Sequence, residues 1–518
     1  MMKNAIGREI PLELTYLKGR ELYAGEFAIA PRGNRQGKKM KLGQKGANKV
    51  LASLQEAVEK TGLKDGMTIS FHHHFRNGDY IIKMVMEAIA AKGIKDLTIM
   101  ASSLNPCHEF LIDYIEDGTV TAIETSGLRD TLGEYLTMHP GCLKRPIVIR
   151  SHGGRARAIE SGEVHIDVAF MGAPSCDCFG NASGSQGKSA CGAIGYALVD
   201  AHHADQTVII TDNLLKGQFL YPYSIPQTDV DYVVEVEAIG DPEGIASGAI
   251  RITKNPIQLK IAQLAAEVVD QTGYLQEGYS LQLGGGGASL AVAQFMREKM
   301  LARGIKGGFG IGGATGIFTE MLQEGLFEII YDTQTFDTTA AASLRDNPRH
   351  VEMTASFYAN PWTDCIVNQL DVVFLSATEV DLDFNVNCMT DSNGILMGAS
   401  GGHSDTAAGA KLAVIVVPLI RGRLPMIRDK VQTVITPGES IDVIVTERGI
   451  AVNPKRADLL EKLKGSNLPL YTIQELQQMS YDLVGKPKDI EVSQDDKDIV
   501  AVVEYRDGSI IDLVRKPL

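Results

Sequence analysis

The sequence lacks any excess of positive charge. It carries 64 acidic residues against 50 Lys and Arg residues, a formal net charge of −14. A phosphate backbone binds a basic protein face, so this balance argues against a nucleic acid as the main partner. Small anionic substrates remain compatible with it, because they need only a few local cations or helix N-termini.

Long apolar runs are also lacking. No run reaches the length that a membrane span needs, and the N-terminal residues 1–20 lack the uninterrupted apolar core of a signal peptide. The seven Cys, an odd number over 518 residues, do not fit a disulfide framework and indicate free thiols in a reducing compartment. We therefore expect a cytoplasmic protein with no membrane partner.

Glycine, in contrast, is abundant. Many of the 53 Gly cluster in loops, which suggests backbone shaped to approach a ligand closely. Hydrophobic residues make up 44% and charged residues 22%, which is ordinary globular composition. A chain of 518 residues is too long for one core, so two or three domains are expected.

An internal repeat is the most informative feature. The segment from Asp65 (DGMTISFHHHFRNGDYIIKMVMEAIAAKGIKDLTI) and the segment from Glu277 (EGYSLQLGGGGASLAVAQFMREKMLARGIKGGFGI) share a strand pattern, a polar or Gly-rich turn and an amphipathic helix ending at Gly-Ile-Lys. A second pair, residues 166–173 and 370–377, follows in the same order, and each continues to an aspartate, Asp177 or Asp381. The period is too long for a solenoid and predicts two homologous domains.

Within each half, Val- and Ile-rich strand patterns alternate with helical ones. Most strands are near-continuous apolar runs, which fit a mostly parallel sheet buried on both faces. The fold class is therefore α/β, two related modules with helices on both faces of each sheet. We divide the chain into an N-terminal arm (1–45), a first module (46–255) and a second module (256–518). A strand pair joined by Asp507-Gly508 is expected in the tail.

Two glycine-rich loops of the second half could carry chemistry. Gly284–Gly287 with Ala288 follows a strand and opens a helix, so its free N–H groups suit an anion or oxyanion. The other, residues 308–316, formally contains a dinucleotide fingerprint, with Asp332 about where a ribose-binding acid would lie. No buried strand pattern precedes this fingerprint, so a dehydrogenase is an alternative of low weight.

Histidines mark two further loops. Residues 71–79 (FHHHFRNGD) occupy the position of the four-glycine loop in the first half, and Arg76 there suits a carboxylate, although a solvated Arg is nearly as common. Residues 398–406 (GASGGHSDT) place His403 beside two glycines, as an oxyanion donor or a residue of a helix N-terminus. Adjacent histidines point in different directions, and Cys176, Cys178 and Cys191 supply only half a zinc site, so no metal is expected.

The second half resembles the coenzyme A transferases. That superfamily has two related α/β modules with the active site between them, and its C-terminal module typically shows Gly-Ala-x-x-Val-Asp, then Asn, a Gly-Gly-x-x-Asp loop and a late Val-rich strand. The matching segments here are 376–381, Asn385 or Asn387, 401–405 and 436–447.

From about Leu51 to Leu513 the chain is similar to the citrate lyase alpha-chain family. The shared motifs are FHHHFRNGD, SHGGR, DVAFMGAPSCDCFGNASG, DFNVN, GASGGH and GIAVNP. The resemblance implies exchange of acetate for citrate on a thioester, giving a citryl thioester and acetate. It also implies an oligomer with two partner chains: a beta chain that cleaves the citryl thioester, and a gamma acyl carrier chain bearing a CoA-like prosthetic group. Free acetyl-CoA is expected to substitute for the carrier. It implies no cofactor bound by this chain itself.

One departure concerns the mechanism. Many coenzyme A transferases use a glutamate in a Ser-Glu-Asn-Gly loop as nucleophile, whereas Ile311–Gly313 in the equivalent region holds no acid, and Asp391–Gly394 also lacks the Glu. We therefore expect direct exchange through a mixed anhydride. The residues assigned to the site are Gly401, Gly402 and His403 for catalysis, Gly285, Gly286, Gly287, Ala288, Gly312 and Gly313 for the thioester, and His72, His73, His74, Arg76 and His152 for citrate. The alternatives are a transferase for another short acid and a non-catalytic scaffold for the partner chains.

Overall fold

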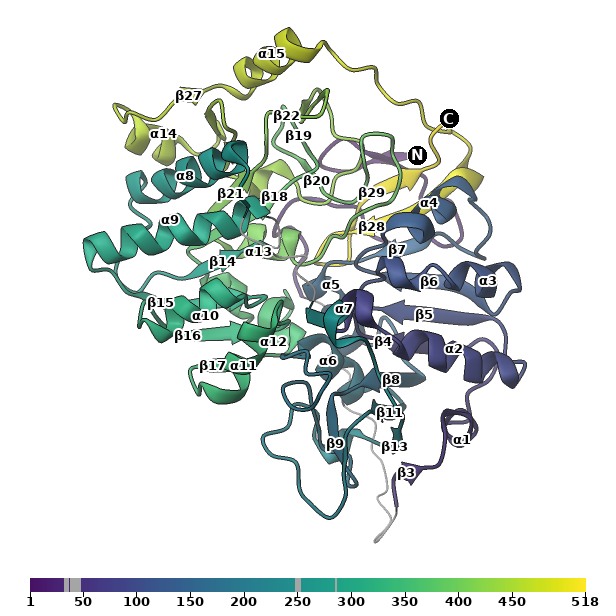
Figure 1. Ribbon diagram of the computed structural model, residues 1–518. Coiled ribbons are helices and arrows are strands. Elements are labelled where there is room, and N and C mark those ends of the chain that lie inside the picture. Colours follow the sequence, from purple (N-terminus) through teal and green to yellow (C-terminus); the bar gives the residue numbers. More distant parts are fainter. Residues whose placement is uncertain (32–36, 38–47, 247–252, 285–286) are drawn as a thin grey trace.

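The computed structural model describes residues 1–31, 37, 48–246, 253–284 and 287–518. In Figure 1 the two halves lie side by side, each built on one large sheet, and the yellow C-terminal strands lie against the sheet of the first half. Residues 285 and 286 of the four-glycine loop, two of the predicted thioester residues, lie outside the described ranges.

The first half alternates strands and helices from residue 50 to residue 246. Its elements are β3 (Val50–Leu51), α1 (Leu54–Lys60), β4 (Thr68–Phe71), α2 (Ile81–Ala91), β5 (Leu97–Ala101), α3 (Leu111–Glu116), β6 (Val120–Thr125), α4 (Asp130–Met138), β7 (Ile147–Ile149), α5 (His152–Glu160), β8 (Val168–Gly172), β9 (Ser175–Asp177), β10 (Ala182–Ser183), α6 (Gly195–His203), β11 (Gln206–Thr211), β12 (Leu214–Leu215), β13 (Tyr232–Glu235) and α7 (Pro242–Ala246).

The second half repeats this alternation. It contains α8 (Pro256–Gln271), β14 (Leu281–Leu283), α9 (Gly287–Arg303), β15 (Gly307–Gly312), α10 (Gly316–Gln323), β16 (Phe327–Asp332), α11 (Thr338–Asp346), β17 (His350–Glu352), α12 (Ala355–Ala359), β18 (Val372–Ser376), β19 (Glu379–Asp381), β20 (Val386–Asn387), α13 (His403–Gly409), β21 (Leu412–Val416), β22 (Ile420–Arg421), β23 (Leu424–Pro425), β24 (Ile427–Arg428), β25 (Val443–Val445), β26 (Ile450–Val452), α14 (Ala457–Leu463), β27 (Leu470–Tyr471) and α15 (Ile473–Val484).

Strand order confirms the duplication. The first sheet contains the run β7-β6-β5-β4-β8-β11-β13 and the second the run β17-β16-β15-β14-β18-β21-β25, with every pair in both runs parallel. The two matched aspartates also make equivalent hydrogen bonds: Asn181 donates to Asp177 at 2.8 Å, and Asn385 donates to Asp381 at 3.1 Å. One sequence pattern has thus folded twice into one topology.

The second sheet is buried on both faces, as its apolar strands predict. Along β18, Val372 and Phe374 pack in one hydrophobic cluster with α8 and α9, whereas Val373 and Leu375 pack in another with α12, α13 and α15. Successive side chains of a strand point to opposite faces, so a continuous apolar run serves two layers of helices. The α/β class with helices on both faces is confirmed.

The predicted strand pair in the tail is confirmed, and it joins the first sheet. β28 (Ile499–Glu504) pairs with β29 (Ile510–Arg515) and runs parallel to β7, so residues from within the predicted range 256–518 extend the sheet of the first half. This C-terminal hairpin covers the edge of β7, whose backbone groups would otherwise be unpaired. Pairing across such a sequence separation depends on tertiary packing and leaves no local signal.

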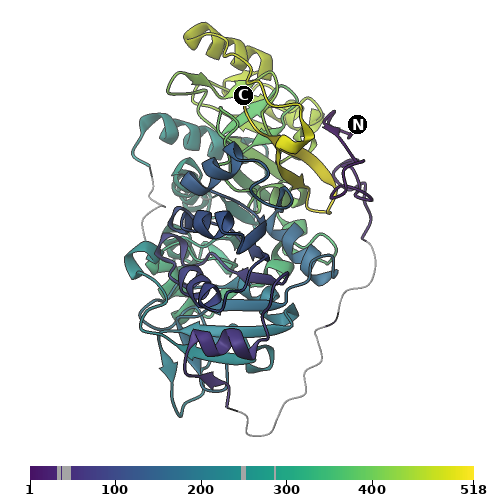
Figure 2. The same ribbon diagram turned by 90° about the vertical axis from the view of Figure 1, so that its right-hand side faces the viewer.

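The N-terminal arm packs on that hairpin. β1 (Met2–Lys3) pairs with β2 (Glu9–Ile10), and Ile10 and Leu17 are buried against strand residues of the hairpin. Figure 2 shows the purple N-terminal segment beside the yellow strands. The two ends of the chain therefore meet on one sheet edge.

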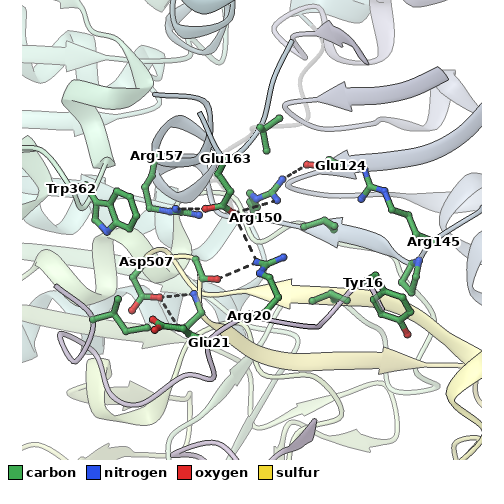
Figure 3. A pocket seen from close by; sticks show the side chains of 18 residues that line it. Tyr16, Arg20, Glu21, Glu124, Arg145, Arg150, Arg157, Glu163, Trp362 and Asp507 are labelled. Carbon is green, nitrogen blue, oxygen red and sulfur yellow. Dashed lines mark hydrogen bonds and ion pairs between the residues drawn. The ribbon is translucent and has the colours of Figure 1, made fainter. Parts of the chain in front are cut away.

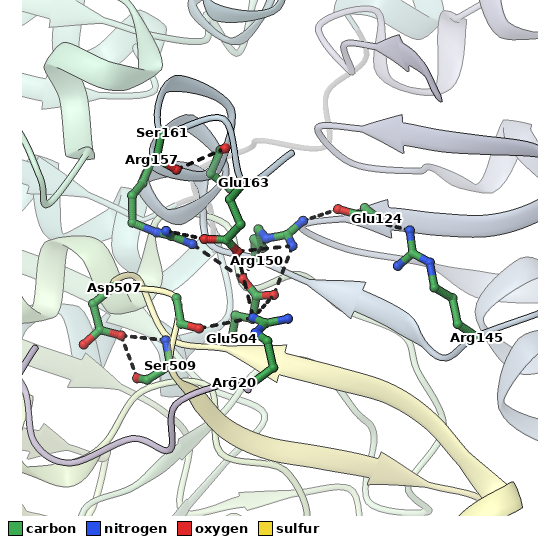
Figure 4. Close-up of polar contacts among 12 residues, drawn as sticks. Arg20, Glu124, Arg145, Arg150, Arg157, Ser161, Glu163, Glu504, Asp507 and Ser509 are labelled. Carbon is green, nitrogen blue, oxygen red and sulfur yellow. Dashed lines mark hydrogen bonds and ion pairs between the residues drawn. The ribbon is translucent and has the colours of Figure 1, made fainter. Parts of the chain in front are cut away.

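A buried ion cluster secures the hairpin to the first sheet (Figure 4). The Glu504 carboxylate accepts from Arg150 at 2.7 and 3.0 Å and from Arg20 at 2.5 Å, and Arg157 lies 3.8 Å away. Its side chain is fully buried. Arginines from the arm, from the end of β7 and from α5 thus share one carboxylate of the hairpin. Figure 3 shows the same three arginines around Glu163 in the adjoining pocket.

Candidate active site between the two halves

A cavity of about 620 Å³ lies between the halves, and its lining comes from both. The first half contributes the segments that follow β4, β5 and β6 and the N-termini of α5 and α6. The second half contributes the carboxyl ends of β14 and β18, the segments that follow β15 and β16, Tyr358 of α12, Cys388 and residues 398–403. Carboxyl ends of parallel strands are where open α/β sheets bind ligands. Duplication has placed two such edges against one another.

The loops after the equivalent strands β6 and β16 cross between the halves. Gly127, after β6, forms an isolated bridge with Ala399 of the second half, and Gln334, after β16, forms one with Ile194 of the first. A loop of each half therefore pairs with the other half, and the cavity forms only when both halves are folded together.

The three adjacent histidines divide between the cavity and the core. His73 lines the cavity, with Nδ1 at 2.6 Å from the Ser102 hydroxyl and Nε2 at 3.1 Å from the Gln334 side-chain oxygen. His72 and His74 lie behind it, fully buried, and bond to main-chain carbonyls of Gly172 and Thr333. Consecutive side chains point in different directions, so only His73 of these three histidines lines the cavity, beside Arg76 and His152 of the five residues predicted to bind citrate.

Arg76 joins the two halves. Its guanidinium donates to the carbonyls of Phe336 at 2.7 Å and Thr335 at 2.6 Å and stacks 4.7 Å from the Phe336 ring centroid. The side chain still lines the cavity, but these bonds take up much of its donor capacity. Arg76 therefore holds the loop after β16 in place, and fewer of its N–H groups are left to bind a carboxylate.

Arg129 is a second cavity arginine, and the sequence reasoning missed it. It follows β6 and donates to the uncharged oxygens of Ser103 at 2.9 Å and Asn105 at 3.4 Å. Burial lowers its pKa without neutralising it, because an arginine starts above 12. The repeat held a signal for it, since its loop is the counterpart of the loop after β16, at the carboxyl edge of the sheet.

His152, at the start of α5, lies in the same wall. Its ring packs 4.3 Å from the Tyr196 ring centroid, and its Nδ1 is buried without a hydrogen-bond partner. Burial, followed by the charges of Arg155 and Arg129, lowers its pKa to about 3. The imidazole is therefore neutral at pH 7, and its Nδ1 is available to a ligand.

The Gly401–His403 loop reaches the cavity from the second half. His403 uses both ring nitrogens, with Nδ1 at 2.7 Å from the Thr436 hydroxyl and Nε2 at 3.2 Å from the Ser376 carbonyl, and burial lowers its pKa to about 4. The N–H groups of Gly401 and Gly402 make no hydrogen bond to another described residue. The donors that this loop can offer are therefore its two glycine amides.

Of the four predicted thioester residues that the structure describes, Gly313 lines the cavity, together with Gly284. Gly312 turns the chain before Gly313 with φ of +105°, and Gly287 and Ala288 open α9, and these three are not part of the cavity lining. A Cβ on Gly313 would lie 1.8 Å from the Phe336 ring, so only glycine fits at this position.

No Asp or Glu is among the described residues that line the cavity. Asp332 instead braces the loops around it, accepting from the N–H groups of Ala314 at 3.1 Å and Gln334 at 3.0 Å. The segment Asp391–Gly394 contributes Ser392 and Gly394 to a different cavity. The wall thus combines arginines, neutral imidazoles and glycine amides.

The dinucleotide fingerprint is explained by packing. Gly308 and Gly310 lie within β15 rather than in a strand-to-helix turn, and a Cβ on Gly310 would lie 2.2 Å from the Phe318 ring of α10. The geometry that presents a pyrophosphate to a helix N-terminus is absent from this described segment. The placement of Gly308 and Gly310 within β15 therefore argues against a dinucleotide-binding dehydrogenase.

None of the helices that the described residues form combines the length and apolarity needed to cross a bilayer. Among those residues, His165, Asp167 and Asp205 form the group with metal-ligand geometry, and none of the three lines the cavity.

Known proteins share this architecture and sequence. The family described as "Citrate lyase, alpha subunit" matches residues 47–517. The citrate lyase alpha chain of Klebsiella pneumoniae is 51% identical over 474 residues, covering 91% of this chain and 92% of that protein. That of Haemophilus influenzae is 50% identical over 467 residues, covering 90% and 92%.

Solved structures agree. The alpha subunit of citrate lyase from Streptococcus mutans, in complex with citrate, is 52% identical, with a TM-score of 0.95 over 99% of this chain and 100% of that one. A Pseudomonas malonate decarboxylase hetero-tetramer shares the fold alone, at 17% identity and a TM-score of 0.65 over 85% and 88% of the chains. This chain therefore belongs to the citrate lyase alpha-subunit family, the acyl-transferase component of a multisubunit citrate lyase.

Proposed function

We propose that the cavity between the halves exchanges acetate for citrate on a thioester, giving a citryl thioester and acetate. The observation that carries this proposal is one cavity whose described lining holds arginines, neutral imidazoles and glycine amides and no carboxylate. Such a wall attracts a multiply charged carboxylate and offers no acid to attack the thioester itself. The bound citrate in the Streptococcus mutans relative supports the same substrate.

Arg129 is the residue that we assign to a citrate carboxylate. Its side chain donates to the neutral oxygens of Ser103 and Asn105, so a citrate carboxylate would be its one anionic partner within the described cavity wall. His152 contributes a neutral ring nitrogen beside it, and Arg76 offers the N–H groups that its bonds to Thr335 and Phe336 leave free. His73 lines the same wall, with its ring nitrogens bonded to Ser102 and Gln334. A charge-assisted bond to a buried arginine is roughly twice as strong as a neutral one.

The exchange proceeds directly, without a glutamyl enzyme. A citrate carboxylate oxygen attacks the acetyl thioester carbonyl, and collapse of the tetrahedral intermediate expels the thiolate and leaves an acetyl–citryl anhydride. The thiolate then attacks the citryl carbonyl, and acetate leaves with the bridging oxygen. Both intermediates carry an oxyanion, for which the amides of Gly401 and Gly402, and those at Gly287 and Ala288, are fixed donors.

The acyl group arrives on a thiol that this chain does not itself hold. We propose that a gamma acyl carrier chain with a CoA-like prosthetic group presents it, that acetyl-CoA substitutes for the carrier, and that a beta chain cleaves the citryl thioester. The glycine-lined side at Gly284 and Gly313 accepts the thioester, because it has no side chains to obstruct a long substrate.

The test is an assay of the purified chain with acetyl-CoA and a panel of di- and tricarboxylic acids, with acyl-CoA products identified by mass. Citrate should give citryl-CoA, and dicarboxylates should give little product. A transferase for another short acid would be indifferent to citrate, and a scaffold would give no product with any acid. Either result would overturn the proposal.

A further inference from the structure

The start of α5 is bonded across the interface to the loop that begins α13. The N–H of His152 donates to the carbonyl of Gly401 at 2.8 Å, and the N–H of Gly153 and the hydroxyl of Ser151 donate to the Asp405 carboxylate. Three consecutive residues of the first half are thus fixed to one loop of the second. They include His152, whose buried Nδ1 makes no hydrogen bond.

Asp405 is closely packed at this junction between the start of α5 and the loop that begins α13. Its side chain is fully buried, with Oδ1 at 2.8 Å from the Ser151 hydroxyl and Oδ2 at 2.9 Å from the Gly153 nitrogen. A Cβ on Gly153 would lie 2.0 Å from the carbonyl of Ala359 and 2.6 Å from Asp405 Oδ1, so the close approach needs glycine there. Ser151 also accepts from Gly154 at 3.0 Å and so caps α5.

The charge of Asp405 has one nearby counter-charge. Arg506, in the turn of the C-terminal hairpin, places its Nε 3.7 Å from Asp405 Oδ1. The other titratable groups that sense this carboxylate are Tyr196, Tyr358 and Cys365, and burial raises the pKa of each, so they are neutral at pH 7. His152 is neutral as well, because its pKa is lowered to about 3.

We propose that Asp405 is a positioning residue for the transfer reaction: it holds the start of α5, and with it His152, in register with the oxyanion-binding amides of Gly401 and Gly402, while Arg506 balances its charge. The inference rests on the site proposed above. Asp405 is absent from the cavity lining and acts through the groups that it fixes. The C-terminal hairpin thereby serves the site, because it delivers Arg506.

The pH dependence follows from the same contacts. Burial raises the pKa of Asp405 to about 6, against the opposing effects of Arg506, Gly153 and Ser151. Above about pH 6 the carboxylate is charged and accepts both bonds, and below it the added proton weakens the junction. A carboxyl whose pKa rises on folding binds its proton more tightly in the folded state, so acidification stabilises the fold at this residue while it slows the reaction.

The experiment measures kcat with saturating citrate and acetyl-CoA between pH 5 and 8, because kcat reports groups of the enzyme–substrate complex. The wild type should lose activity below about pH 6. Asp405→Asn should lower kcat at pH 7.5 by roughly 10- to 100-fold, the loss expected when reacting groups are misplaced by about 1 Å, with both KM values nearly unchanged. Its pH profile should be flat where the wild type falls.

Asp371→Asn is the matched control. Asp371 is another buried carboxylate of the second half, and it accepts from the N–H and the hydroxyl of Ser280 at 2.8 and 3.0 Å. It precedes β18, at the strand end opposite to Ser376 of the cavity. This variant should keep the wild-type kcat and the fall in activity below about pH 6.

Ser151→Ala removes one of the two bonds to Asp405 and leaves the carboxyl group in place. It should lower kcat several-fold and keep the fall below about pH 6. If Asp405→Asn keeps that fall, or if Asp371→Asn lowers kcat as much as Asp405→Asn does, the positioning role is wrong. Absence of any citrate-dependent product from the wild type would instead refute the proposed function.

Discussion

Arg20, Arg150 and Arg157 share two carboxylates, the buried Glu504 and the partly exposed Glu163. Replacing Glu504 by glutamine removes the buried one and keeps its shape (Figure 4). The Glu504 side chain is fully buried and that of Arg150 is 6% exposed, so water cannot replace the lost charge. Breaking a buried ion pair by removing one partner costs about 3–5 kcal/mol, and here the three arginines keep only Glu124 and the partly exposed Glu163 as counter-charges among the described ion pairs. We therefore expect the C-terminal hairpin to loosen from β7.

The expected shift in melting temperature can be worked out. With an unfolding entropy of ~2.1 cal/mol/K per residue, a loss of about 4 kcal/mol lowers Tm by about 4 °C if all 518 residues unfold together, and by about twice that if one half unfolds alone. Calorimetry measures the shift, and limited proteolysis between residues 485 and 498 reports release of the hairpin.

Glu324→Gln provides the control. Glu324 also forms a two-pronged pair with an arginine, Arg297, but at the surface. Exposed pairs contribute little, so its Tm should stay within about 1 °C of the wild type. Equal shifts in the two variants, or an intact hairpin in Glu504→Gln, would refute the reasoning that burial makes this cluster important.

Three further predictions concern the cavity. Arg129→Met should raise the KM for citrate by roughly 10- to 150-fold, the equivalent of a lost charge-assisted bond, while the KM for acetyl-CoA stays near the wild-type value and Arg297→Met changes neither; equal effects on both substrates would contradict the assignment. Gly313→Ala should abolish most activity, because its Cβ would displace the Phe336 ring on which Arg76 stacks, and wild-type kinetics would show that this loop is not part of the site. Titration with a reduced nicotinamide cofactor, followed by fluorescence, should show no saturable binding, since Gly308 and Gly310 lie within β15. Saturable binding would support the dehydrogenase alternative.

The fold was predictable from the sequence to the extent that patterns repeat locally. The two segments from Asp65 and Glu277 predicted two modules of one topology, because each carries its own strand, turn and helix signals. The apolar runs predicted sheets buried on both faces. The partner of the β28–β29 hairpin was not predictable, because an apolar hairpin can cover any free sheet edge and only tertiary packing selects β7.

The site was predictable where motifs bring glycine and histidine together. His73, Arg76, His152, Gly313 and residues 401–403 all line one cavity. Arg129 carried no motif, since a single arginine in a polar loop is usually solvated, and Asp405 was recognisable only as part of a Gly-Gly-x-x-Asp loop. Their roles depend on contacts between halves that are far apart in the sequence.

The most direct test of direct exchange is chemical trapping. The chain is incubated with acetyl-CoA labelled in its acetyl group and in its CoA moiety, treated with borohydride or hydroxylamine, digested and examined by mass spectrometry, with and without citrate. A cavity whose described wall holds no acid predicts that every Glu and Asp stays unmodified while citryl-CoA forms. A Glu that is reduced or converted to its hydroxamate, at a rate matching turnover, would contradict direct exchange and show a covalent acyl-enzyme.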